Sequence, residues 1–158
     1  MSGAANRRGG VPVGYVSELG TVEAASVLYL RLWSDGPEAQ AQIWNDLASM
    51  LGPDEGKQAL QAFEQLCDLC ARHGRRPLMR HSLHCKCLGA DESCFANFIG
   101  AASEGDHEDA MLIATTIVRA DMAPCLAGLA ARFGLALRRM ALRETVHRPQ
   151  PHQTNRLH

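Results

Sequence analysis

The stretch from Asp35 to His73, DGPEAQAQIWNDLASMLGPDEGKQALQAFEQLCDLCARH, determines the fold class predicted for this 158-residue chain. The same pattern occurs twice: a glycine ends one helix and the proline that follows it begins the next, at Gly36-Pro37 and at Gly52-Pro53. Proline suits the first helical turn because the amide hydrogen that it lacks would have no partner there. Apolar residues then recur every three or four positions, as on one face of a helix. They are Ile43, Trp44, Leu47 and Leu51 in the first segment, and Leu60, Phe63, Cys67 and Cys70 in the second. The stretch therefore predicts two consecutive amphipathic helices.

Helical spacing continues on both sides of this stretch. It predicts a helix that begins at Thr21, one after Asp91, one after Asp106 and one that opens at 121–124. No strand-like alternation and no internal repeat are evident, and the 46% hydrophobic content is ordinary for a globular domain. We therefore predict an all-α fold: a single helical bundle of about six helices at 21–143, interrupted by a Cys/His-rich metal-binding loop at 67–89. A flexible N-terminal arm is expected at 1–20 and a disordered C-terminal tail at 144–158.

The metal-binding loop predicted at 67–89 consists almost entirely of the run CDLCARHGRRPLMRHSLHCKC, from Cys67 to Cys87. It contains a C-x2-C pair, a gap of 14 residues and a C-x-C pair. Closely spaced thiolate pairs are typical of tetrahedral structural zinc sites. The predicted metal ligands are therefore Cys67, Cys70, Cys85 and Cys87, with zinc as the metal.

Other interpretations of these cysteines stay open. Cys67 and Cys70 continue the apolar stripe of their helix, and free cysteine is often buried, so both fit a core position equally well. His81 and His84 would then join Cys85 and Cys87 as an alternative four-donor set. An iron–sulfur centre or Cu(I) also suits soft thiolates. Reversible chemistry at the same thiols would make the protein a redox or metal sensor.

The net charge of −1 hides two charge blocks along the chain. Residues 72–86 contain five lysines and arginines and no acid, whereas residues 91–109 contain six acids and no lysine or arginine. The two blocks can face each other in the fold or can bind oppositely charged partners. We therefore expect the basic loop and the acidic 91–109 surface to be the contact faces for a protein partner.

The segment Leu129–Met140, LAARFGLALRRM, resembles the core of a bacterial helix-turn-helix, with Gly134 at the turn. A break at Gly134 would place Arg138, Arg139 and Arg143 on a recognition helix that contacts nucleic acid. The alternative function is therefore a DNA-binding regulator that uses residues 123–143. An uninterrupted amphipathic helix explains the same apolar positions, and it is our preferred interpretation.

No catalytic motif supports an enzyme. The chain lacks His-Glu-x-x-His, a glycine-rich phosphate loop and Gly-x-Ser-x-Gly. No apolar run approaches the roughly 18–20 residues that span a bilayer, so no membrane association is expected. Six cysteines without a recognisable export signal indicate a reducing, cytoplasmic location. The predicted function is a small, zinc-binding, non-catalytic regulatory or adaptor protein that binds a macromolecular partner.

Overall fold

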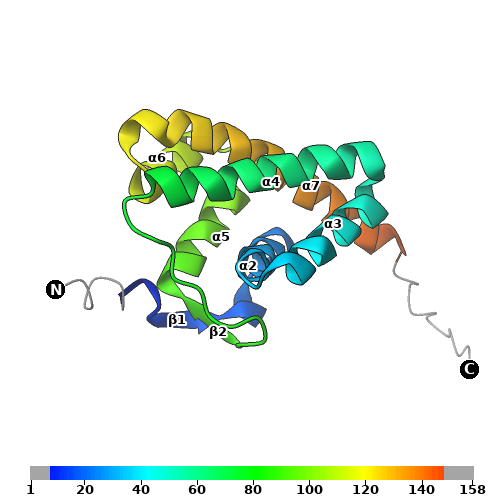
Figure 1. The fold of residues 1–158 in the computed structure, drawn as a ribbon, viewed down its shortest axis with the longest axis horizontal. Coiled ribbons are helices and arrows are strands. Elements are labelled where there is room, and N and C mark those ends of the chain that lie inside the picture. Colours follow the sequence, from blue (N-terminus) through cyan, green and yellow to red (C-terminus); the bar gives the residue numbers. More distant parts are fainter. Residues whose placement is uncertain (1–7, 148–158) are drawn as a thin grey trace, which may run out of the picture.

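The computed structural model describes residues 8–147, and in this range the chain folds into six α-helices and one small two-stranded sheet (Figure 1). The helical class and the number of helices agree with the prediction from the sequence. The helices are α2 (Thr21–Trp33), α3 (Pro37–Leu51), α4 (Pro53–His73), α5 (Ala90–Ser103), α6 (His107–Ile117) and α7 (Ala123–His147). The strands are β1 (Pro12–Tyr15) and β2 (Cys87–Gly89), and the short 3-10 turns are η1 (Val16–Glu18) and η2 (Ala120–Met122).

The two Gly-Pro steps act as the sequence predicts. Gly36 and Gly52 have φ angles of 99° and 87°, in the region that favours glycine over other residues. Each is followed at once by the proline that begins the next helix, Pro37 in α3 and Pro53 in α4. The chain can therefore reverse between long helices without a loop.

Aromatic rings from three helices meet at the centre of the core. The rings of Phe63 in α4 and Phe133 in α7 stack with their centroids 4.6 Å apart. Trp33 contacts Phe63 edge-on at 5.5 Å, and Tyr29 lies 6.3 Å from Phe133. Phe95, Phe98 and Ile99 of α5 are fully buried in the same cluster. One core thus joins α2, α4, α5 and α7.

Helix α7 runs without a break from Ala123 to His147. A methyl group on Gly134 would lie 3.0 Å from the Ile99 carbonyl oxygen and 3.1 Å from Ser103 of α5. Gly134 therefore serves close helix packing instead of a turn, and Leu135 is 46% exposed. The break at Gly134 that the helix-turn-helix alternative requires is absent from this helix, in agreement with our preferred interpretation of an uninterrupted helix, and DNA binding through residues 123–143 stays a prediction.

The segment Ala120–Val146 is the one stretch of residues 8–147 that is long and apolar enough, by length and composition, to cross a membrane. Of its most apolar window, 44% is buried inside the protein, where Leu126, Phe133 and Leu137 form part of the core. Core helices of globular proteins meet the same criterion, so this segment is weak evidence for a membrane span.

The N-terminal segment differs from the prediction of a flexible arm. Residues 12–15 form β1, which pairs antiparallel with β2, Tyr15 opposite Cys87 and Gly14 opposite Leu88. The Val16 amide also donates to the Lys86 carbonyl at 2.9 Å. Sequence alternation gave no signal because most of β1 is exposed on both faces. At the other end, α7 includes residues 144–147 of the predicted tail, while residues 1–7 and 148–158 lie outside the described range.

Candidate functional site

The first cysteine pair of the predicted zinc site lies on the inner face of α4. Cys67 is 7% exposed and belongs to the core, and Cys70 packs against the core one turn later. Burial raises the pKa of the Cys67 thiol far above its ordinary value and raises the pKa of Cys70 to about 12. Metal ligation requires the thiolate form, so a metal ion that bound here would have to displace the proton of each thiol.

The second pair, Cys85 and Cys87, lies at the other end of the connection between α4 and α5. Figure 1 shows the chain leaving the end of α4 and crossing the molecule to β2. In the part of the chain that the structure describes, no group of three or more His, Cys, Asp and Glu side chains is arranged to hold a metal ion. The structure thus does not bring the four cysteines together, nor His81 and His84 with Cys85 and Cys87. Zinc binding, with either ligand set, stays a prediction.

A buried arginine, Arg31 of α2, holds the connection in place. Its Nε donates to Glu92 Oε2 at 2.6 Å and its Nη2 donates to Glu92 Oε1 at 2.9 Å. The remaining hydrogens point at carbonyls of the connection: Nη1 donates to Cys85 at 2.7 Å and to Leu83 at 3.5 Å, and Nη2 donates to Cys87 at 2.8 Å. All five N–H donors of the guanidinium are therefore engaged.

The acceptor of this pair, Glu92, lies in the first turn of α5 and is fully buried. It also accepts from the Gly89 amide at 3.0 Å, which caps the helix, and from the His81 amide at 3.4 Å. Burial by itself would raise the pKa of Glu92, but the hydrogen bonds from Arg31 and Gly89 hold this pKa below the ordinary value of 4.5. Glu92 thus stays ionised inside the protein.

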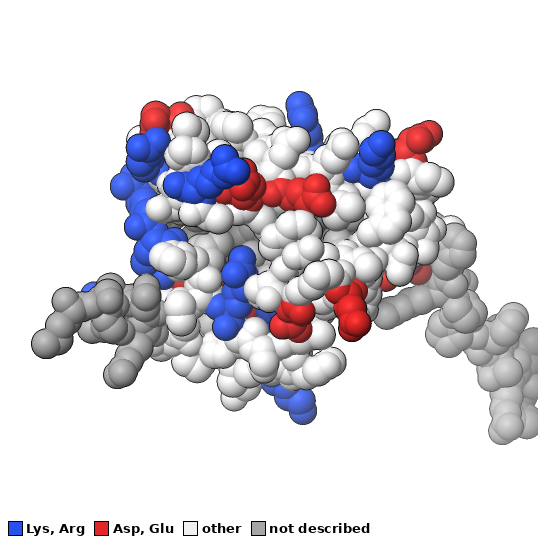
Figure 2. All heavy atoms as spheres, in the orientation of Figure 1, with Lys and Arg blue, Asp and Glu red and all other residues white. Residues whose placement is uncertain are grey.

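A second ion pair fixes the start of the connection. Arg76 makes a bidentate contact with Asp91, with Nη1 2.6 Å from Oδ2, and the Met79 amide donates to the same oxygen at 2.7 Å. Asp91 therefore anchors the connection, while the N-cap of α5 is Gly89. At this point the basic block 72–86 faces the acidic block 91–109, one of the two arrangements that the sequence left open. Figure 2 shows lysines and arginines gathered at the edge of the molecule where α4 ends.

The three arginines proposed for nucleic acid each contact the protein itself. Arg138 donates to the Ser103 carbonyl at 3.2 Å, and Arg139 lies 3.5 Å from the Glu55 carboxylate. Arg143 donates to the Met50 carbonyl. They join α7 to α5, α4 and α3, and this structure gives their nucleic-acid role no support beyond their charge.

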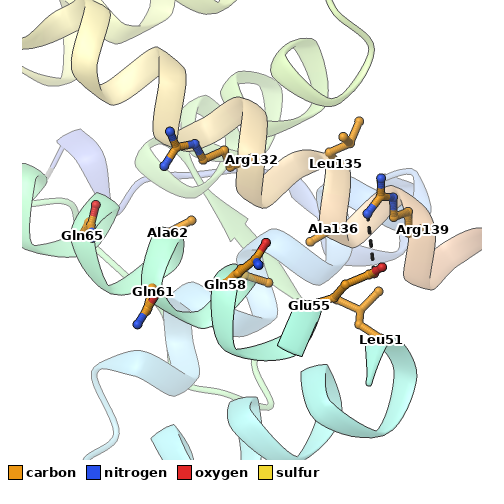
Figure 3. A pocket seen from close by; sticks show the side chains of 11 residues that line it. Leu51, Glu55, Gln58, Gln61, Ala62, Gln65, Arg132, Leu135, Ala136 and Arg139 are labelled. Carbon is orange, nitrogen blue, oxygen red and sulfur yellow. Dashed lines mark hydrogen bonds and ion pairs between the residues drawn. The ribbon is translucent and has the colours of Figure 1, made fainter. Parts of the chain in front are cut away.

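A groove of about 360 Å³ lies between α4 and α7 (Figure 3). Its floor consists of small buried side chains, Ala59, Ala62 and Ala136. One wall is a row of exposed glutamines on α4, and the other wall is formed by exposed residues of α7. The lining residues are Leu51, Glu55, Gln58, Ala59, Gln61, Ala62, Gln65, Arg132, Leu135, Ala136 and Arg139. Sequence reasoning missed this site, although Gln58, Gln61 and Gln65 at helical spacing were a usable signal.

The groove carries positive charge. Within residues 8–147, the Arg132 side chain has no hydrogen-bonded or ion-paired partner. Arg139 faces Glu55 at 3.5 Å, but both side chains are about half exposed, so this pair contributes little. Leu135 lies between the two arginines along the α7 wall (Figure 3). The groove therefore combines an apolar strip, neutral amides, the carboxylate of Glu55 and two accessible cations, with one net positive charge.

Comparison with models of protein families, with curated proteins and with solved structures finds no match to this chain. No relative therefore supplies an activity for this chain.

Proposed function

We propose that this protein is a non-catalytic regulatory or adaptor protein that binds a helical, acidic segment of a protein partner in the groove between α4 and α7. The proposal is based on two neighbouring residues of the groove. Leu135 is an exposed apolar side chain, the Arg132 side chain has no partner, and both line the groove whose floor is formed by alanines. Exposed apolar side chains with a polar rim, often including arginine, are common on recognition surfaces. Small residues in the floor let a partner backbone approach closely.

The walls of the groove define the chemistry of the partner. Arg132 and Arg139 lie seven positions apart, which is about 10.5 Å along a helix at 1.5 Å per residue. A partner helix with two acids at the same spacing can reach both guanidinium groups. The apolar face of such a helix would lie on Leu135 and on the alanine floor, as in other helix-in-groove complexes. Gln58, Gln61 and Gln65 donate and accept hydrogen bonds, so they suit polar side chains at the edge of the partner.

A selection from a library of displayed amphipathic helical peptides tests this proposal with defined probes. The wild-type protein is the bait, and the Leu135→Glu variant is used for counter-selection. We expect the enriched peptides to carry acids seven positions apart beside an aliphatic face. Their affinity should fall about 30-fold for Leu135→Glu and about tenfold for Arg132→Glu, since one is an apolar contact and the other a charge at the rim.

Two control variants make the same chemical changes outside the groove. Leu142→Glu alters another exposed leucine of α7, and Lys57→Glu reverses another exposed cation, on α4. Neither residue lines the groove. Equal losses for the control and the groove variants, or a selection without acidic enrichment, would contradict the proposal.

Zinc binding is not required for this function. The zinc prediction and the groove proposal concern opposite faces of α4, its buried cysteine face and its exposed glutamine row, so each can fail without the other.

A further inference from the structure

The backbone around β2 places Cys85 and Cys87 on one face of an extended segment. The carbonyls of Cys85 and Cys87 both point to Arg31, whereas the carbonyl between them, of Lys86, points the opposite way and accepts from Val16. Carbonyls alternate in this manner only in extended chain, where side chains two residues apart share a face. Exposure follows the same pattern, because Cys85 and Cys87 are half-buried and Lys86 is exposed. The side chains of Cys85 and Cys87 therefore lie on the same face of the segment.

An unpaired nitrogen lies further along the same face. Gly89 follows Cys87 by two residues and therefore lies on the same face as Cys85 and Cys87. A methyl group on Gly89 would lie 3.1 Å from Nε2 of His81. This Nε2 is buried and is the one side-chain nitrogen or oxygen of the described range that is buried without a hydrogen-bond partner. A buried polar atom without a partner is uncommon in folded proteins. His81 Nε2 therefore lies beside Gly89, but among the described residues it forms no three-ligand group with Cys85 and Cys87.

Hydrogen bonds hold the backbone of this site, and one of its two half-buried cysteines borders a hollow. Arg31 fixes both cysteine carbonyls through hydrogen bonds within 2.8 Å, and its ion pair with Glu92 is buried. Cys85 also borders a hollow of about 460 Å³ between β1, α2 and the connection. Cys67 differs in that it is 7% exposed and belongs to the core, against which Cys70 packs. Of the two cysteine pairs, the pair on the connection therefore has the better access for an incoming ion.

We propose that Cys85 and Cys87 form a two-thiolate site for a soft monovalent metal ion such as Cu(I). Such an ion accepts two thiolates in a linear arrangement, so it needs no third ligand, and soft sulfur donors favour it over hard cations. Binding releases one proton from each thiol to solvent and leaves a complex with one net negative charge. Lys86 is adjacent in sequence and offsets that charge. The site does not depend on the groove between α4 and α7.

Anaerobic titration with Cu(I) in competition with a chromophoric Cu(I) chelator tests the site. The whole chain as given by its sequence should bind one Cu(I) ion. Cys85→Ser and Cys87→Ser should each weaken binding about 100-fold or more, because the second thiolate acts as a tethered donor. Cys70→Ser and Cys125→Ser, outside the connection, should leave the affinity unchanged. X-ray absorption of the complex should show two sulfur neighbours.

A measurement on the wild-type protein avoids dependence on variants. Bound Cu(I) should protect Cys85 and Cys87, but not the exposed Cys125, from alkylation as followed by mass spectrometry. No Cu(I) binding, or equal losses in Cys70→Ser and Cys85→Ser, would overturn the proposal. Stoichiometric zinc that requires all four of Cys67, Cys70, Cys85 and Cys87 would also overturn it and would favour the closed four-cysteine site.

Discussion

Arg31 of α2 and Glu92 of α5 form an ion pair that is closed to solvent, with side chains 3% and 0% exposed and an Nε–Oε2 distance of 2.6 Å. They are 61 residues apart in the sequence, and the same guanidinium holds three carbonyls of the connection. The pair therefore determines where the chain between α4 and α5 lies, which is the role that the sequence analysis gave to zinc.

Removal of one partner of this pair should destabilise the protein strongly. Glu92→Ala leaves the Arg31 charge buried without its counter-ion, and we expect a loss of about 3–5 kcal/mol in the free energy of unfolding. Asp68→Ala is the matched control, because it breaks an exposed pair with Arg72 and should cost at most about 1 kcal/mol. Urea denaturation of both variants measures the difference. Similar losses would show that the buried pair has no special role.

Stability should depend on pH through Glu92. The pKa of this carboxyl is lower in the folded protein than its ordinary value of 4.5. A depressed pKa contributes stability that is fully present above the unfolded value and is lost as the pH falls through the folded pKa. The stability gap between wild type and Glu92→Gln should therefore be constant near neutral pH and should shrink below about pH 4.5. A gap that stays constant down to the acid unfolding transition would contradict this assignment.

The cysteines should differ in reactivity according to burial. Burial raises the pKa of both Cys67 and Cys70, and the thiolate is the reactive form, so both should alkylate slowly at pH 8. Cys125 is exposed and should react fast. Mass spectrometry after timed iodoacetamide treatment gives the order of modification. Modification of Cys67 as early as that of Cys125 would place Cys67 outside the core.

Two glycines of α7 should respond to alanine in opposite directions. A methyl group on Gly128 meets no atom within 4 Å, so Gly128→Ala should stabilise the helix by about 0.5–1 kcal/mol. At Gly134 the same methyl group lies 3.0–3.1 Å from α5 backbone atoms and from the Ser103 side chain, so Gly134→Ala should lower stability by about 1 kcal/mol. Thermal unfolding distinguishes them. Equal stabilisation by both changes would mean that α7 does not pack closely on α5.

The helices were predictable because their signals are local. The Gly-Pro steps at Pro37 and Pro53, the Asp106 cap and the apolar spacing each act within one or two turns, and the helices begin and end close to where these signals place them. The Asp106 side chain accepts from the Asp109 amide, as an N-cap does. Local patterns of this kind do not depend on how distant segments meet.

The connection and the groove depend on contacts between distant residues, which spacing does not reveal. A single arginine in an apolar helix, Arg31, gives no sign that it binds the carbonyls of residues 83–87. The spacing of the cysteines suggests a metal site whether or not the thiols meet. Here Cys67 and Cys70 continue the apolar stripe of their helix into the core, and the spacing alone does not reveal this. The groove requires α4 and α7 to lie together, a pairing between residues more than 60 positions apart in the sequence.

A charge-reversal cycle between the groove and a selected peptide measures whether Arg132 pairs with an acid of the bound helix. Isothermal titration would compare wild type and Arg132→Glu against the peptide and against a version with the contacting acid changed to lysine. The account predicts that each single reversal weakens binding about tenfold and that the two together restore most of the affinity, because the ion pair is re-formed with its charges exchanged. Additive losses in the double reversal would contradict the placement of an acidic helix against Arg132.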